Sequence, residues 1–154
     1  MQTLRHNPRQ SAEEFREACV REGLAVTHQR VVIYQALLAS RSHPSPEEVY
    51  ERVRKEIPSI SLGTVYKNIK TFIDHGLLGE VSLHHGHTRL ETNLKPHHHL
   101  VCLRCKAIID LHDEDLEPVR LRARAPGGFR IQRYSVEAIG ICPACAKTEL
   151  KTRK

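Results

Sequence analysis

Two C-x-x-C pairs constrain this chain more than any other feature of its sequence. The pairs are Cys102 with Cys105 and Cys142 with Cys145, and 36 residues lie between them. Four thiolates from two tight turns can complete the tetrahedral shell that Zn²⁺ prefers, with Zn–S bonds of about 2.3 Å, and they leave no position open for a substrate. The spacing therefore predicts a closed, structural zinc site.

Disulfides or a redox-active pair are the alternative interpretation of the same cysteines. A thioredoxin-like motif needs its C-x-x-C where a strand runs into a helix of a β-α-β unit, and neither pair has that predicted setting. Residues 1–10 are polar and carry no signal-peptide core, so the sequence predicts a cytoplasmic protein, a compartment in which disulfides are rare. The fifth cysteine, Cys19, lies apart and is expected in a hydrophobic core.

Histidine is the other unusual count, with 11 in 154 residues. His97 and His99 alternate with His98 in a predicted strand, so these two project from one face and can clamp a metal. Carboxylates occur in neighbouring strand-like segments. Three histidines with two carboxylates form a harder donor set than four thiolates, and this set suits Fe²⁺ or Mn²⁺ as well as Zn²⁺. The candidate ligands of this regulatory metal site are His43, Glu91, His97, His99 and Asp110.

Simpler interpretations of these histidines stay open at this point. His43 also fits a turn in the segment His-Pro-Ser-Pro, and His98 is expected to face solvent or to support the ligands from behind. His84, His85 and His87 fit a solvated hairpin turn, because polar residues are typical of turns. Spacing alone does not separate these roles from metal binding.

The first part of the chain has the pattern of a winged helix-turn-helix domain. Helical periodicity, N-caps and breakers predict four helices, at residues 11–23, 28–39, 46–57 and 62–75. Two strand-like segments follow, at 80–83 and 88–92, and predict a hairpin. An amphipathic last helix followed by a hairpin is typical of domains that insert one helix into DNA.

The fourth predicted helix carries a polar face opposite an apolar face that includes Leu62 and Phe72. Ammonium groups can neutralise phosphates, and a tyrosine ring can press on a thymine methyl group while its hydroxyl reaches phosphate. Hydroxyls at the helix N-terminus suit phosphate oxygens. A solvated polar face is the simpler alternative. The candidate DNA-binding residues are Ser61, Thr64, Tyr66, Lys67 and Lys70.

The chain changes character after a short predicted hinge at 93–96. The elements expected beyond it are strands at 97–103, 107–111 and 129–141 and a helix at 113–124. The sequence therefore predicts an α+β protein. A winged helix-turn-helix domain at 1–92 is followed by a small α/β domain at 97–154 that holds the zinc site.

These segments together resemble the Fur family of metal-dependent bacterial repressors over about residues 11–150. The matching stretches are Gly23–Arg30, His43–Ser45, Ser61–Tyr66, His97–Cys105, Asp110 and Gly140–Cys145. The resemblance implies that the second domain is a dimerisation domain and that a homodimer binds a palindromic operator in double-stranded DNA. It also implies structural zinc on the four paired cysteines, and a regulatory metal on the histidine and carboxylate set that closes the dimer onto DNA.

Within the family, individual positions favour different branches. The aspartate at position 110 resembles the residue that the peroxide sensor PerR has there, where the iron sensor Fur has a glutamate. The glutamate at position 91 is more similar to the residue of the iron sensor Fur. Pro96 and Tyr134 stand at positions that look like the histidines of an additional metal site, so no third site is expected. The resemblance favours a PerR-like repressor in which Fe²⁺ reacts with peroxide and a ligand histidine is oxidised. An iron-responsive repressor of iron uptake, or a zinc- or manganese-responsive member, is the alternative.

Other classes of function find little support in the sequence. No G-x-S-x-G, P-loop or H-E-x-x-H motif is present, and no residue at motif spacing is left as a general base, so an enzyme is disfavoured. No apolar run approaches the ~20 residues that cross a bilayer. Of the net charge of +6, residues to Glu80 contribute +1 (11 basic, 10 acidic) and the rest +5 (13 basic, 8 acidic). Bulk charge therefore adds little to the DNA prediction.

Overall fold

The chain folds into two compact units, Met1–Leu94 and Lys95–Lys154, in a computed structural model of the protein. No helix among the described residues is long and apolar enough to span a membrane. The structure describes residues 8–40, 43–82, 88–95, 97–112, 116, 126–131 and 134–152.

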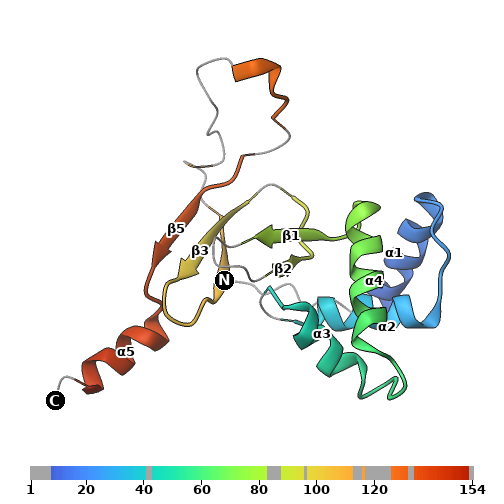
Figure 1. The fold of residues 1–154 in the computed structure, drawn as a ribbon, viewed down its shortest axis with the longest axis horizontal. Helices are drawn as coiled ribbons and strands as arrows, with labels where there is room; N and C mark the ends of the chain where they lie inside the picture. The colour runs from blue at the N-terminus through green and yellow to red at the C-terminus, as the bar shows by residue number, and fades with distance from the viewer. Residues whose placement is uncertain are drawn as a thin grey trace. The chain divides into compact units, whose positions relative to one another are not determined.

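The first unit contains the four helices and the hairpin that the sequence predicts (Figure 1). Its elements are α1 (Pro8–Arg21), α2 (His28–Leu38), α3 (Pro46–Val53), α4 (Leu62–Asp74), β1 (Gly79–Ser82) and β2 (Thr88–Glu91). The two strands pair antiparallel, with Glu80 opposite Leu90. The predicted turn that carries His84, His85 and His87 lies outside the described residues.

Local capping explains where these helices begin and end. Ser45 and Glu48 form a capping box at α3, because each side chain accepts a hydrogen bond from the other residue's backbone N–H, at 3.3 and 2.8 Å. Thr27 and Ser61 cap α2 and α4 in the same local way. After α4, Gly76 has a φ of +66°, the left-handed conformation that ends many helices.

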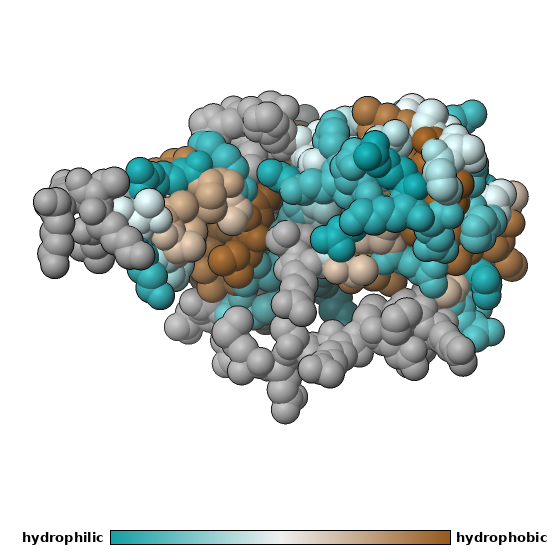
Figure 2. All heavy atoms as spheres, turned by 90° about the horizontal axis from the view of Figure 1, so that it is seen from below, coloured by the Kyte–Doolittle hydropathy of each residue, from teal (hydrophilic) through white to brown (hydrophobic). Residues whose placement is uncertain are grey.

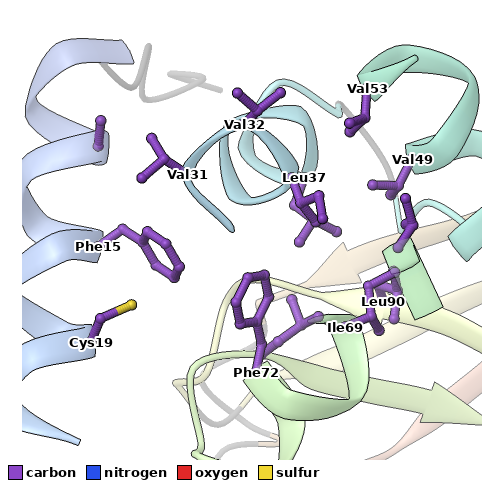
Figure 3. Close-up of a cluster of buried hydrophobic side chains, with 14 of the residues drawn as sticks. Phe15, Cys19, Val31, Val32, Leu37, Val49, Val53, Ile69, Phe72 and Leu90 are labelled. Carbon is purple, nitrogen blue, oxygen red and sulfur yellow. The ribbon is translucent and has the colours of Figure 1, made fainter. Parts of the chain in front are cut away.

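Aromatic rings lie at the centre of the helical core, where Figure 3 shows Phe15 and Phe72 among the buried side chains. Phe15 stacks on Tyr34 at 4.1 Å between ring centroids and meets Phe72 edge-on at 5.2 Å. Cys19 is fully buried in the same cluster, so the prediction of a core role for it is confirmed. The prediction for Leu62 is wrong, because its side chain is 38% exposed. It is the first residue of α4, where the helix has not yet reached the core.

The second unit is a three-stranded sheet followed by a helix. Its elements are β3 (His98–Cys102), β4 (Ile108–Leu111), β5 (Glu137–Gly140), a 3₁₀ turn (Pro126–Gly128) and α5 (Pro143–Thr152). The strand order is β4-β3-β5, with β3 antiparallel to β4 and parallel to β5. The α+β class expected from the sequence is thereby confirmed.

Two predictions for the second unit differ from the structure, and a third is not covered. The long strand at 129–141 is wrong, since only Glu137–Gly140 pairs with a neighbour. The described residues earlier in that segment, 129–131 and 134–136, belong to no strand, although several have β-forming side chains. The predicted helix at 113–124 lies outside the described residues apart from residue 116, a turn. Helix α5 was not predicted, although Pro143 at its first position is a start signal.

Apolar side chains of the sheet unit are largely exposed. Among its described residues only Val101, Cys102 and Ile108 are buried hydrophobics. Ile109 and Ile139 are 47% and 58% exposed. Figure 2 shows brown, hydrophobic residues at the surface of the molecule. A core this small stabilises a fold weakly unless a metal or a partner surface adds to it.

Candidate metal centres and nucleic-acid interface

The parallel pairing of β3 with β5 brings the two C-x-x-C pairs together. Cys102 ends β3 opposite Gly140, which ends β5. Cys105 lies in the turn after β3, whereas Cys142 and Cys145 lie at the start of α5. One Sγ atom from each of the four cysteines lies within 4.8 Å of the others. The cluster is therefore built by sheet register across a long separation in sequence.

The distances in this cluster fit a metal better than disulfides. All four thiols are free, and Sγ of Cys105 lies 3.7 Å from Sγ of Cys142. A disulfide requires about 2.05 Å. A tetrahedron with Zn–S bonds of about 2.3 Å has edges of about 3.8 Å, which matches this separation. The donor set thus fits a tetrahedral thiophilic cation.

Backbone amides prepare one of these sulfurs as a thiolate. The N–H of Cys142 donates to Sγ of Cys102 at 3.4 Å. This bond, with a second from the backbone of Cys105, lowers the pKa of Cys102 to about 6. The hydrogen bond with Cys142 is the main cause that raises the pKa of Cys145 to about 12. Four thiolates this close need a bound cation to offset their mutual repulsion.

In the first unit, His43 and Glu91 form a buried pair. His43 Nε2 lies 2.5 Å from Oε2 of Glu91, and the two residues are 9% and 5% exposed. The N–H of Leu90 donates to the carbonyl of Pro44 at 2.9 Å, which fastens the segment before α3 to the end of β2. The backbone N–H of Asn93 donates to the second carboxylate oxygen. The first unit therefore holds one nitrogen and one carboxylate donor in fixed positions.

In the second unit, His97, His99 and Asp110 form a cluster on one side of the sheet. His99 and Asp110 are partners in the register of β3 and β4. One ligand atom of each of the three residues lies within 4.8 Å of the others. His97 Nδ1 bonds to the carbonyl of Lys95 at 2.7 Å, whereas Nε2 lies 3.5 Å from the Asp110 carboxylate. Such a backbone bond orients a ring whose other nitrogen serves as a metal ligand.

Two further histidines, His98 and His112, lie close to this cluster in the sequence. His98 is 4% exposed, and its Nδ1 accepts the backbone N–H of Val136 at 3.0 Å. Of the two expectations for His98, exposure to solvent is therefore wrong, whereas support of the ligands from behind stays a prediction; its hydrogen bond joins β3 to the chain before β5. The ring of His112 lies 5.9 Å from that of His97. No sequence feature indicated that His112 lies near these ligands, because it follows the end of β4 and belongs to no ligand motif.

The outward face of α4 carries the candidate DNA-binding side chains. Lys67 is exposed, and Tyr66 is 43% exposed. Lys70 Nζ lies 3.3 Å from the carboxylate of Asp74 one turn later, an exposed pair that a phosphate can replace at little cost. Leu62 adds an apolar surface one turn before Tyr66. Cationic, aromatic and apolar groups therefore share this face.

Ser61 and Thr64 are engaged with each other at the start of α4. Ser61 Oγ accepts the backbone N–H of Thr64 at 3.1 Å and lies 2.9 Å from its hydroxyl oxygen. These two hydroxyls therefore act first as a helix cap.

Glu47, which no sequence motif singled out, contacts the candidate DNA-binding face. The hydroxyl of Tyr66 donates a hydrogen bond to Oε1 of Glu47 in the first turn of α3. This bond lowers the pKa of Glu47 and raises that of Tyr66. Glu48, which follows Glu47 in α3, has its Oε2 atom 3.0 Å from Nη1 of Arg89 in β2. No sequence signal indicated either contact, because each joins residues far apart in the chain.

Comparison with known proteins identifies the family. The sequence pattern of the ferric uptake regulator family matches residues 21–139. This chain belongs to the ferric uptake regulator family. The resemblance inferred from its motifs is thereby confirmed.

Relatives of the chain are named for different regulatory roles. The peroxide-responsive repressor PerR of Staphylococcus epidermidis is 30% identical over 145 residues, which cover 94% of each chain. A zinc-bound manganese uptake regulator is 32% identical, with a TM-score of 0.67 over 86% of this chain and 98% of that one. The ferric uptake regulator of Helicobacter pylori shares the fold, with a TM-score of 0.71 at 22% identity over 95% of this chain and 97% of that one. These relatives are regulators and not enzymes.

Proposed function

We propose that this protein is a metal-dependent, DNA-binding transcriptional repressor that responds to peroxide through Fe²⁺. The buried His43–Glu91 pair carries the metal-dependent part of the proposal. A histidine and a carboxylate at 2.5 Å, both less than a tenth exposed, provide a nitrogen and an oxygen donor away from bulk water. The similarity to a peroxide-responsive repressor supports the peroxide response.

The regulatory ion would be shared between the two units. Glu91 is the last residue of β2 in the first unit, and His97 follows six residues later in the second. An ion bound by donors from both units would restrain their relative orientation and thereby set how a dimer meets DNA. The proposed ligands are His43, Glu91, His97, His99 and Asp110.

Bound Fe²⁺ would supply the one-electron chemistry that peroxide cleavage requires. In the net reaction, the O–O bond of hydrogen peroxide breaks, one oxygen atom adds to a ring carbon of a ligand histidine and the other leaves as water. The imidazole is oxidised by two electrons and peroxide is reduced. His43 and His97 are the proposed targets, and loss of a ligand would release the metal and the DNA.

The cysteine cluster would hold structural Zn²⁺. Four thiolates on one Zn²⁺ leave no open position for a substrate, the four sulfurs lie within 4.8 Å of one another, and the described part of the sheet unit has little core of its own. The ion would therefore stabilise the fold of this unit rather than perform chemistry.

Exposed apolar residues of the sheet unit support a homodimer. Leu100 and Ile109, partners in the register of β3 and β4, are 40% and 47% exposed on one face of the sheet, and a second copy of the chain would cover such a surface. A two-fold dimer presents two α4 helices, so its double-stranded operator would be palindromic. Lys67 and Lys70 would contact phosphates or bases and Tyr66 the major groove, while Ser61 and Thr64 hold the start of α4.

One experiment tests the peroxide response directly. The protein is loaded with Fe²⁺ or, as a control, with Mn²⁺, treated with micromolar peroxide and digested. We expect a gain of about 16 Da, one oxygen atom, on a peptide that contains His43 or His97, with loss of operator binding in the iron-loaded sample only. Unmodified peptides with unchanged operator binding would contradict the proposal.

An iron-responsive repressor is the second candidate, and Glu91 is the observation that favours it. A glutamate at this position is more similar to iron sensors, and here it lies in the buried pair with His43. This candidate predicts operator binding that needs Fe²⁺ but does not change on peroxide treatment. The experiment above therefore separates the two functions.

A further inference from the structure

Tyr66 is held by a residue that the proposed function does not use. Its ring lies on the exposed face of α4, and its hydroxyl donates a hydrogen bond to Oε1 of Glu47. The two residues are 19 apart in sequence and belong to different helices. The bond therefore fixes an exposed side chain that would otherwise sample several rotamers.

The partner in this bond is itself well placed. Glu47 lies in the first turn of α3, where the helix dipole favours a negative charge. Hydrogen bonds from Tyr66 and then Ser45 lower its pKa. Glu47 is therefore ionised at neutral pH and acts only as an acceptor.

A phenol has one O–H group and lone pairs on the same oxygen. When the O–H of Tyr66 points at Glu47, only the lone pairs are left for DNA. Phosphate oxygens cannot donate, so the hydroxyl has no bond to offer them. The amino groups of adenine and cytosine in the major groove are donors and can bond to those lone pairs.

We propose that Glu47 is a specificity-determining residue that holds the Tyr66 hydroxyl as an acceptor for a base amino group. This inference rests on the proposed DNA binding by α4. It replaces the expectation that the tyrosine hydroxyl reaches phosphate. The negative charge of Glu47 also opposes the approach of phosphates to the same position.

The surroundings of Glu47 allow it to be changed without loss of the fold. Its side chain is exposed, and the cap of α3 depends on Ser45 and Glu48 instead. Glu51 provides a matched control, because it is exposed on the same helix and pairs with Arg54 at 3.1 Å, whereas the Tyr66 hydroxyl bonds to Glu47. Glu51→Ala removes the same charge as Glu47→Ala but leaves the tyrosine bond intact.

The test compares two DNA affinities of the full chain loaded with Mn²⁺. One duplex is selected by the wild-type protein from a random-sequence pool, and the other is a scrambled duplex of the same composition. The ratio of the two Kd values measures specificity and cancels general charge effects. A wild-type ratio near one would overturn the proposed function, and this inference with it.

Given a discriminating wild type, Glu47→Ala is expected to lower the ratio about tenfold, the scale of one lost base contact. Glu47→Gln keeps an oxygen acceptor for the hydroxyl and should retain the ratio within about twofold. Glu51→Ala should leave it unchanged. Tyr66→Phe should lower the ratio as much as Glu47→Ala does. In the Tyr66→Phe variant, adding Glu47→Ala should lower the ratio no further.

Removal of single amino groups tests the acceptor role itself. Each adenine of the selected duplex is replaced in turn by purine, and each cytosine by 2-pyrimidinone, which lack the major-groove amino group. One replacement should weaken wild-type binding about tenfold and leave Tyr66→Phe unaffected. The proposal is overturned if no replacement has this pattern. It is also overturned if Glu47→Ala leaves the ratio of the two Kd values unchanged, or if Glu47→Ala lowers that ratio as much in the Tyr66→Phe variant as in the wild type.

Discussion

Phe72 shows how much one side chain contributes to the helical unit. It is fully buried and meets both other aromatic rings of the core edge-on, Phe15 at 5.2 Å and Tyr34 at 6.1 Å. Edge-to-face pairs add to the burial of apolar area. A cavity at this position would remove contacts with α1 and α2 together.

Phe72→Ala is expected to reduce the free energy of unfolding by about 3–5 kcal/mol, because the ring leaves a cavity in a packed core. Urea titration followed by far-UV circular dichroism measures the loss. The matched control is Val20→Ala, since Val20 is 72% exposed on α1, and it should change stability by less than about 0.5 kcal/mol. Equal effects of the two substitutions would contradict this view of the core.

At the scale of elements, backbone conformation decides which glycines of α4 are required. Gly76 follows the helix with a φ of +66°, and an added Cβ would meet nothing within 4 Å. Its cost on substitution is therefore conformational alone. Gly63 is the second residue of α4 and has helical backbone conformation, and an added Cβ there would meet only Ser61 Oγ, at an ordinary 3.8 Å.

Substitution of these two glycines by alanine is expected to change the stability of the protein in opposite directions. Gly76→Ala should destabilise the protein by about 1–2 kcal/mol, because a left-handed conformation strains an L-residue. Gly63→Ala should stabilise it by about 0.5–1 kcal/mol, because glycine is unfavourable inside a helix. Thermal unfolding of both variants beside the wild type measures the difference. The same sign for both would show that α4 does not end in the way described.

At the scale of the whole molecule, the two units differ in how they are stabilised. The first unit has a continuous hydrophobic cluster from α1 to β2. The described part of the second unit has three buried hydrophobic residues, one of them the proposed zinc ligand Cys102. Stability of the second unit should therefore depend on metal.

Removal of zinc is expected to unfold the second unit and leave the first folded. Incubation with a strong zinc chelator, followed by hydrogen exchange and mass spectrometry, should show loss of protection in β3, β5 and α5 but not in α2 or α4. Readdition of Zn²⁺ should restore protection. Unchanged protection after complete loss of zinc would contradict a structural role for the ion.

A shared regulatory ion makes a different prediction for the whole chain. His43→Ala in the first unit and His97→Ala in the second should each weaken Mn²⁺ binding at one and the same site. Loss of one of five ligands should reduce the affinity for Mn²⁺ at least tenfold, because loss of a residue that only hydrogen-bonds to a ligand already reduces metal affinity by about 10–100-fold. Isothermal titration with and without each substitution measures this. His112→Ala is the control, and independent sites for the two histidines would contradict a shared ion.

Local rules account for the part of the fold that the sequence predicts well. Caps such as Thr27, Ser45 and Ser61 act over three residues, so their partners are visible in the sequence itself. The period of the apolar residues then identifies the buried face of each helix. The C-x-x-C spacing likewise predicts a metal cluster, because two ligands from one turn need no knowledge of the remaining fold.

Pairings between distant segments were decided by the tertiary structure alone. The register of β3 on β5 joins the two cysteine pairs and leaves most of 129–141 outside the sheet, and strand register depends on partners far along the chain. The burial of His98 and the bond between Glu47 and Tyr66 arise in the same way. The sequence by itself therefore determined the four helices of the first unit, the donor types and the family, because these depend on neighbouring residues. Only the tertiary structure decided which side chain orients another, because that depends on contacts between elements.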